Sequence, residues 1–164
     1  APLAMVGCGF STDMAALGIQ WHVLAMFAPS FFTGKLIARF GYAPIIASGL
    51  VILIACAVIA GMGIELWNFW GALVLLGVGW NFGFIGATTM VSTTYRPAEK
   101  NKVQGVHDVI LFGTVAFASL MSGRVLNSFG WDAISQVLWP AALLCLLLLA
   151  LQVRSDRKNR EIAG

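Results

Sequence analysis

Charged residues are scarce in this chain of 164 residues. Asp, Glu, Lys and Arg make up 10% of the positions and hydrophobic residues 59%, whereas soluble globular domains contain about 25% charged residues. So few charges exclude a soluble globular domain. The net charge of +3 does not indicate a nucleic-acid partner, because the basic residues stand at breaks between apolar stretches. The composition indicates an integral membrane protein whose first partner is the lipid bilayer.

The sequence also lacks the patterns of disulfide frameworks, metal sites and catalytic centres. Its three cysteines, Cys8, Cys56 and Cys145, stand far apart, and we interpret them as packing residues. It contains no GxSxG sequence, no paired carboxylates and no cluster with metal-ligand spacing. We therefore expect no cofactor and no enzyme activity. An intramembrane enzyme that uses His22, or His107 with Asp108, is kept as an alternative.

Five apolar stretches are long enough to cross a hydrocarbon core of about 30 Å as helices of about 20 residues. They cover residues 17–34, 43–63, 66–95, 106–126 and 133–153, and residues 154–164 follow as a polar tail. Residues 1–10 are apolar but too short to span, and no initiator Met or charged signal-peptide region precedes them. We interpret them as the end of a truncated helix. The predicted fold is all-α, a single transmembrane domain of five full helices plus a truncated one.

The basic residues predict the orientation of the chain. Nine of the ten follow the first, third and fifth stretches: Lys35, Arg39, Arg96, Lys100, Lys102, Arg154, Arg157, Lys158 and Arg160. If the helices alternate in direction, all nine lie on one side, which the positive-inside rule makes cytoplasmic. We thus expect a cell-membrane protein with a cytoplasmic C-terminus. The alternative is that RSDRKNR at 154–160 binds anionic lipid or nucleic acid. This alternative requires a binding partner, whereas a basic flank that stops translocation of the last helix requires none.

Two segments of the chain resemble each other. GKLIARFGYAPI at 34–45 and GRVLNSFGWDAI at 123–134 share both glycines, the Phe and the final Ile. The first copy ends a stretch running into the cell and the second ends one running outward, so the repeat is inverted. Inverted repeats are typical of secondary transporters, whose three-helix units form six-helix halves. The alternative is that helix ends rich in glycine and flanked by basic residues recur by chance.

The segment GKLIARFG resembles the short cytoplasmic loop of the major facilitator superfamily. The match covers Gly34, Arg39 and Gly41, and Ala38 stands where the family has an acidic residue. RPAEKNKVQG at 96–105 resembles the loop between the family's tenth and eleventh helices, and SGRVLNSFGW resembles the outer end of the eleventh. The resemblance implies that the chain corresponds to the end of helix seven through helix twelve. A missing N-terminal half of six helices is then a further partner.

Polar side chains inside the apolar stretches are candidate contacts for a solute, because such groups are costly in hydrocarbon. Gln20 and His22 stand near the outer end of the first stretch, and Trp80 and Asn81 stand near the middle of the third. An imidazole can also carry a proton near physiological pH. The alternative for both His22 and Asn81 is a hydrogen bond to a facing helix. Pro29 predicts a kink.

Two groups of glycines bear on helix packing. The spacing of Gly79, Gly83 and Gly86 predicts close contact with another helix. We expect Gly34, Arg39 and Gly41 to form a cytoplasmic hinge loop, in which Gly34 permits close helix approach and Gly41 a tight reversal.

Asp108 and Arg124 are candidate gate or coupling residues. Asp108 begins the fourth stretch at its cytoplasmic end, where a helix dipole also favours a carboxylate. Arg124 can reach the headgroups or pair with Asp13 or Asp132.

The sequence therefore favours one function over two others. The favoured function is transport of a small solute by alternating access, as the C-terminal part of a secondary permease, with His22 and Asp108 suggesting proton coupling. The alternatives are a structural or assembly subunit and the intramembrane enzyme. The substrate, the direction of transport and the oligomeric state are not determined by the sequence.

Overall fold

A computed structural model describes residues 1–163, with their side chains except those of residues 132, 134, 135, 157 and 159–163. In this range the chain forms only helices: α1 (Pro2–Gly7), α2 (Thr12–Phe27), α3 (Ser30–Phe40), α4 (Tyr42–Gly61), α5 (Leu66–Ser92), the 3-10 helix η1 (Pro97–Glu99) and α6 (Lys100–Ala163). The predicted all-α class is confirmed.

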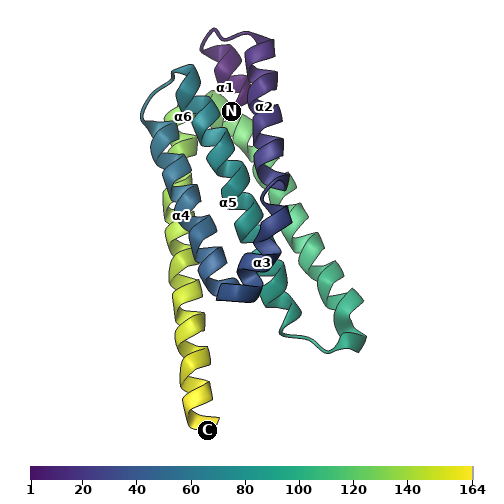
Figure 1. Ribbon diagram of the computed structural model, residues 1–164. Helices are drawn as coiled ribbons and strands as arrows, with labels where there is room; N and C mark the ends of the chain where they lie inside the picture. The colour runs from purple at the N-terminus through teal and green to yellow at the C-terminus, as the bar shows by residue number, and fades with distance from the viewer. Residues whose placement is uncertain (164) are drawn as a thin grey trace.

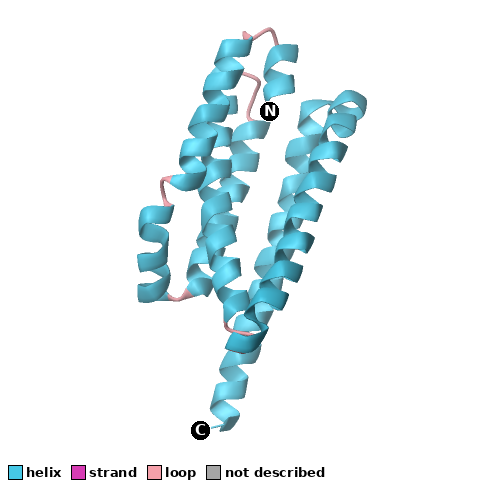
Figure 2. Ribbon diagram, turned by 90° about the vertical axis from the view of Figure 1, so that its right-hand side faces the viewer, coloured by secondary structure: helices cyan, strands magenta, loops and turns pink. Residues whose placement is uncertain are grey.

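The helices run back and forth along one direction (Figure 1). α2 and α3 follow one another down the bundle, α4 returns, α5 descends, and α6 rises and then descends to the C-terminus. α6 is therefore two helices, which meet at Gly130, where the backbone leaves the helical conformation. The connections gather at the two ends of the bundle (Figure 2). Successive spans thus alternate in direction, as the sequence predicts.

Among the described residues, five segments are long and apolar enough to cross a membrane, which is the predicted number. They are Thr12–Phe40, Tyr42–Gly61, Leu66–Ser92, Pro97–Trp131 and Gln136–Asp156. Most of these segments extend beyond the predicted apolar stretches at one or both ends, because a helix can continue from the hydrocarbon into the headgroup region. The first of these segments, for example, begins with α2 after Ser11, whose hydroxyl accepts a hydrogen bond from the backbone N of Met14 at 3.2 Å.

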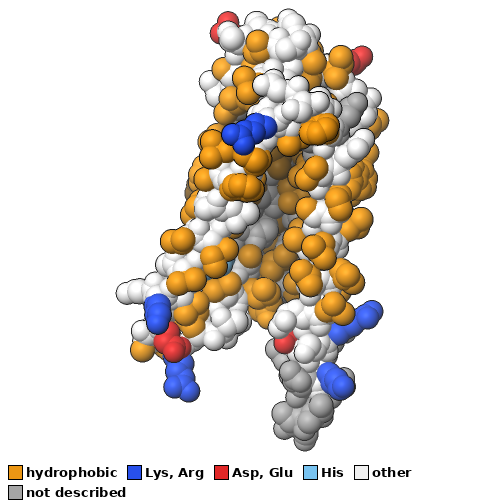
Figure 3. Space-filling model, turned by 180° about the vertical axis from the view of Figure 1, so that it is seen from behind, with side chains coloured by type: hydrophobic (Ala, Val, Ile, Leu, Met, Phe, Trp, Pro, Cys, Tyr) orange, Lys and Arg blue, Asp and Glu red, His pale blue; other side chains and the backbone are white. Residues whose placement is uncertain are grey.

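The surface is apolar along the bundle and charged at its ends (Figure 3). The ends of α3 and of α6 and the turn around η1 carry most of the basic residues, and they lie at the same end of the molecule. Large hydrophobic side chains such as Phe31, Phe117 and Leu120 are exposed. This distribution fits a bundle surrounded by lipid.

α4 and α5 approach each other closely at glycines. A Cβ added at Gly49 of α4 would lie 2.8 Å from the backbone N of Gly83 and 2.9 Å from the backbone O of Gly79. A Cβ added at Gly86 would lie 2.6 Å from Cγ1 of Ile46. The predicted packing role is therefore confirmed for Gly79 and Gly86, whose partner is α4, whereas a Cβ at Gly83 would meet no described atom within 4 Å.

An aromatic cluster joins the helices at the end where α1 lies. The ring of Phe69, which is 1% exposed, meets Phe10 at a centroid distance of 6.0 Å and Trp131 at 5.0 Å. Trp131 also donates a hydrogen bond from Nε1 to the backbone O of Ala60 at 2.9 Å. The corner at Gly130 is thereby held against α4 and α5.

Candidate functional site

α2 and α5 pack side by side, and His22 lies in their contact. The Nδ1 atom of His22 is 2.8 Å from the backbone O of Leu73. A carbonyl oxygen only accepts, so Nδ1 carries a hydrogen and donates it to Leu73. The contact is close because Gly77 has no side chain: a Cβ there would lie 2.6 Å from the backbone O of His22. In this structure His22 therefore bonds a facing helix.

Asn81 lies deeper in the bundle, in the same contact between helices. It is 3% exposed, and its Nδ2 donates to the backbone O of Met26 and to Oγ of Ser30, both at 2.7 Å. Its Oδ1 lies 2.7 Å from the hydroxyl of Thr33, which donates to it. The carboxamide thus has partners in both α2 and α3, and both of its hydrogens are used.

The other two predicted cavity residues lie elsewhere. Trp80 is partly buried and stacks on Phe84, with the ring centroids 6.1 Å apart and the planes 7° apart. Phe84 in turn meets Phe112 of α6 at 6.4 Å, so this aromatic row faces α6 rather than α2. The side chain of Gln20 is exposed. The structure therefore brings His22 and Asn81 into one interface and places Trp80 and Gln20 outside it.

Of the residues of the predicted hinge loop, Gly41 lies at the corner between α3 and α4, whereas Gly34 and Arg39 lie within α3. Gly41 has φ 86° and ψ 166°, which confirms the tight reversal. Arg39 is exposed, with its guanidinium carbon 5.2 Å from the centroid of the Phe40 ring. The close helix approach expected at Gly34 is wrong for the described chain: no atom lies within 4 Å of a Cβ built there. Gly34 is exposed, so none of the described helices faces it.

The predicted gate residues lie at opposite ends of α6's first half. Asp108 is half-exposed, and its Oδ1 is 3.2 Å from Nδ1 of His107. Arg124 is exposed near the other end, and the described side chains include no ion pair between it and Asp13. The alternative partner of Arg124, the side chain of Asp132, lies outside the described residues.

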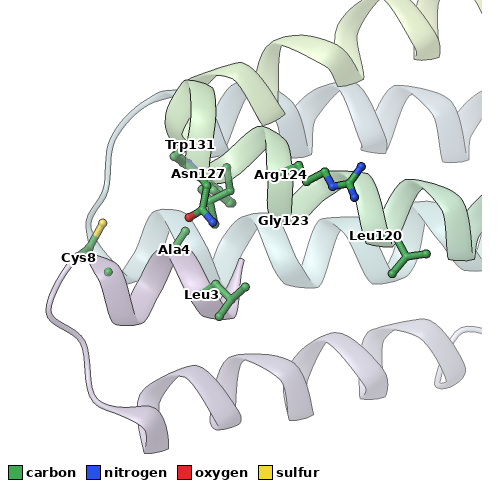
Figure 4. Close-up of a pocket in the computed structure, with 10 residues that line it drawn as sticks. Leu3, Ala4, Cys8, Leu120, Gly123, Arg124, Asn127 and Trp131 are labelled. Carbon is green, nitrogen blue, oxygen red and sulfur yellow. The ribbon is translucent and has the colours of Figure 1, made fainter.

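Arg124 lines a cavity of about 710 Å³ between α1 and α6. Figure 4 shows Arg124, Asn127 and Trp131 on α6. Leu3 and Ala4 of α1, and Cys8 directly after α1, lie across from them. A second cavity, of about 660 Å³, lies at the other end between the Gly41 corner and the last turns of the described α6. Neither cavity includes His22 or Asn81.

Sequence reasoning missed three hydroxyl groups. Ser30 and Thr33 bond Asn81, and the hydroxyl of Thr88 is buried with no hydrogen-bond partner among the described residues. The position of Ser30 directly after Pro29 was a usable signal, because a proline frees backbone groups that nearby side chains then satisfy. The described residues include no group of His, Cys, Asp and Glu that could hold a metal ion.

Comparison with known proteins gives one family and three relatives. The model of the Major Facilitator Superfamily matches residues 2–164. The chain is 58% identical to the riboflavin transporter RfnT of Brucella anthropi over 154 residues, 94% of this chain and 39% of that protein. It is 35% identical to the uncharacterized MFS-type transporter YddS of Bacillus subtilis over 170 residues, 99% of this chain and 37% of that protein.

The uncharacterized MFS-type transporter YdeG of Bacillus subtilis is 35% identical over 147 residues, 87% of this chain and 34% of that protein. No solved structure matches the chain. The chain thus spans less than two fifths of the length of each of these relatives.

Proposed function

The chain belongs to the major facilitator superfamily, and from this membership we propose that it is the C-terminal part of a secondary permease that carries a flavin such as riboflavin. The observation that carries the proposal is the 58% identity to a riboflavin transporter over 94% of this chain. The chain covers 39% of that relative, so the proposal concerns a longer protein. A preceding six-helix half supplies the other wall of the solute path, and the two halves alternate access to it.

The aromatic row on α5 and α6 suits a flavin chemically. The isoalloxazine ring is planar and heteroaromatic, and stacking of such a ring on an aromatic side chain contributes about 1–3 kcal/mol. Trp80 and Phe84 have nearly parallel rings, and Phe112 of α6 is 54% exposed beside them. We assign these three side chains to the solute-facing wall, with Gln20 and His22 as polar contacts. Asn81 stays outside this wall, because its carboxamide is buried and hydrogen-bonded to α2 and α3.

The proposed cycle uses the two ends of the bundle as gates. Asp108 and Arg124 act at the cytoplasmic and outer gates. The corner at Gly41, with Gly34 and Arg39 in the helix that precedes it, is the cytoplasmic hinge. Proton coupling through His22 and Asp108 follows from the chemistry of these groups. The C-terminus is cytoplasmic and the protein resides in the cell membrane, because the basic residues concentrate at one end. The chain itself catalyses no covalent reaction.

Flavin uptake by the full-length protein tests this function. The protein is reconstituted in liposomes, and entry of riboflavin is followed with and without an imposed pH gradient. We expect saturable uptake that a gradient accelerates. If a pH gradient does not change the rate of uptake, proton coupling is excluded, but the protein is still a riboflavin transporter. Absence of any flux, together with stable association in a larger complex, would favour the assembly-subunit alternative.

A further inference from the structure

The first membrane-spanning segment is interrupted at Pro29. α2 ends at Phe27 and α3 begins at Ser30. Proline has no N–H, so the carbonyl of Ala25, four residues earlier, cannot receive its usual helical hydrogen bond. The break is buried in the bundle, since Pro29 itself is a buried residue. Such a break in hydrocarbon needs polar groups from neighbouring helices.

Asn81 supplies these polar groups on both sides of the break. Its Nδ2 bonds the backbone O of Met26, which precedes Pro29, and Oγ of Ser30, which follows it. Its Oδ1 accepts from the hydroxyl of Thr33, one turn further along α3. Because the Met26 carbonyl only accepts, Nδ2 must face it, which fixes the orientation of the amide. A single carboxamide therefore joins α5 to both halves of the broken segment.

α3 has little else to hold it. Thr33 is the one buried residue among the described residues of α3, while Phe31 is 89% exposed and Phe40 54% exposed. The helix ends at Gly41, whose φ of 86° makes a second backbone break. α3 is thus a short helix between two breaks, and near its beginning Ser30 and Thr33 both bond Asn81. Segments with few buried contacts are those that open at low cost.

The hydroxyl of Thr33 has a second hydrogen-bond acceptor within reach. It lies 2.7 Å from Oδ1 of Asn81 and 2.8 Å from the backbone O of Pro29, within its own segment. A hydroxyl has one hydrogen and donates it to one of these acceptors at a time. If α3 leaves Asn81, the hydroxyl can bond Pro29 instead, so the movement leaves no unpaired donor on α3.

We propose that Asn81 is a positioning residue that clamps α3 onto α2, and that release of this clamp lets α3 swing between Pro29 and Gly41 during transport. The proposal rests on the proposed function, because it assigns the movement to solute translocation. The two backbone breaks act as hinges, and Asn81 and Thr33 form the latch between them.

Distances between spin labels in the full-length protein test the clamp. The labels are placed at Ala38→Cys on α3 and Ser92→Cys at the end of α5, both exposed positions, after the protein's own cysteines are replaced. Asn81→Ala removes all hydrogen bonds of the latch, and Thr33→Val removes the buried bond between Thr33 and Oδ1 of Asn81. Thr33→Ser keeps the hydroxyl, and Asn68→Ala is the matched control, since Asn68 also lies on α5 and donates to a backbone carbonyl, that of Ile59 at 3.1 Å.

We expect Asn81→Ala and Thr33→Val to broaden the distance distribution or add a second population, and Thr33→Ser and Asn68→Ala to leave it as in the wild type. Maximal riboflavin flux should fall several-fold in the first two variants, with KM changed less than twofold. If both latch variants match Asn68→Ala in their distances, the clamp is overturned. If Asn81→Ala does not fold, the comparison of Thr33→Val with Thr33→Ser tests the clamp by itself.

Pro29→Ala separates the clamp from a general loss of stability. Pro29 has φ −64° and ψ −20°, which alanine adopts without strain, and the new N–H can bond the carbonyl of Ala25. In the double variant with Asn81→Ala the distribution should narrow again, and a distribution as broad as that of Asn81→Ala alone would contradict the hinge at Pro29. The distances do not depend on the solute. Normal distances without riboflavin flux would refute the proposed function and leave the clamp intact.

Discussion

Gly41 and Gly130 have the same unusual backbone conformation at the same position of the two repeated segments. Gly41 has φ 86° and ψ 166°, and Gly130 has φ 79° and ψ −174°. This region of backbone space is open essentially to glycine alone. Each glycine turns the chain from one span into the next, one at each end of the bundle. The sequence repeat is therefore a repeat of a structural corner.

Gly41→Ala and Gly130→Ala should each lower the stability of the full-length protein by about 1–3 kcal/mol. No atom of the described chain lies within 4 Å of a Cβ built at either glycine, so the cost comes from the backbone and not from a clash. The midpoint of thermal unfolding in detergent measures it.

The first glycine of each copy provides the control. Gly34 and Gly123 lie in helices, and a Cβ there also meets no described atom within 4 Å. Their alanine variants should be neutral or stabilising by up to about 1 kcal/mol, because alanine favours helix. Equal losses at all four positions would contradict the assignment of strain to the corners.

A second prediction compares two glycines of the α4–α5 contact. Gly49→Ala should destabilise by about 1–3 kcal/mol, because its Cβ would meet the backbone of α5 at 2.8 and 2.9 Å and the helices must separate. Gly83→Ala should have little effect, since a Cβ there meets no described atom within 4 Å. Thermal unfolding of the two variants measures the difference in stability. A larger loss of stability in Gly83→Ala than in Gly49→Ala would contradict the described packing of α4 against α5.

Features that belong to one helix could be read from the sequence. The lengths of the apolar stretches gave five spans, Pro29 predicted a kink, and the spacing of Gly79, Gly83 and Gly86 predicted close packing. Each follows from the residues of a single segment and from general costs in hydrocarbon.

Features that depend on how two helices pack against each other could not be predicted from the sequence. The partners of Asn81 are set by the rotation and register of α5 against α2 and α3, which no periodicity in one helix specifies. The close approach expected at Gly34 is not made by any described helix, and a small residue needs a facing helix before it can permit contact. The sequence placed Asn81 and Trp80 together as neighbours, whereas their side chains meet different helices.

A third prediction concerns His22. Asparagine places an N–H near the position of Nδ1, so His22→Asn should keep the bond to Leu73, whereas His22→Ala should lose about 1 kcal/mol of stability. If His22 carries the proton, riboflavin uptake by His22→Asn should no longer respond to a pH gradient while exchange of riboflavin continues. Uptake by this variant that a gradient still accelerates would exclude His22 as the proton carrier.

A fourth prediction concerns the aromatic row. Trp80→Ala should weaken riboflavin binding at least fivefold, because stacking contributes about 1–3 kcal/mol, and Trp80→Phe should recover part of the loss. Quenching of flavin fluorescence on the purified full-length protein measures the affinity. Trp67→Ala is the control, since Trp67 is 73% exposed at the end of α5 and meets Trp70 rather than α6. Equal effects at Trp80 and Trp67 would argue against a stacking site.

The last prediction tests the orientation of the chain through its cysteines. Cys8 is exposed beside the cavity between α1 and α6, at the end opposite Gly41. Cys56 is buried, with its thiol 3.2 Å from the backbone O of Ala72. Cys145 is exposed, but it lies within a segment long and apolar enough to cross a membrane, so we expect it in the hydrocarbon region.

An impermeant maleimide applied to intact cells should therefore modify a single-cysteine variant that keeps Cys8, and should spare variants that keep Cys56 or Cys145. Maleimides react with thiolates, which form in water and not in hydrocarbon. A cysteine introduced at the exposed Lys100, at the basic end of the bundle, should react only after the membrane is permeabilised. The reverse pattern would place the basic end outside the cell, and the orientation inferred from the Lys and Arg residues would then be wrong.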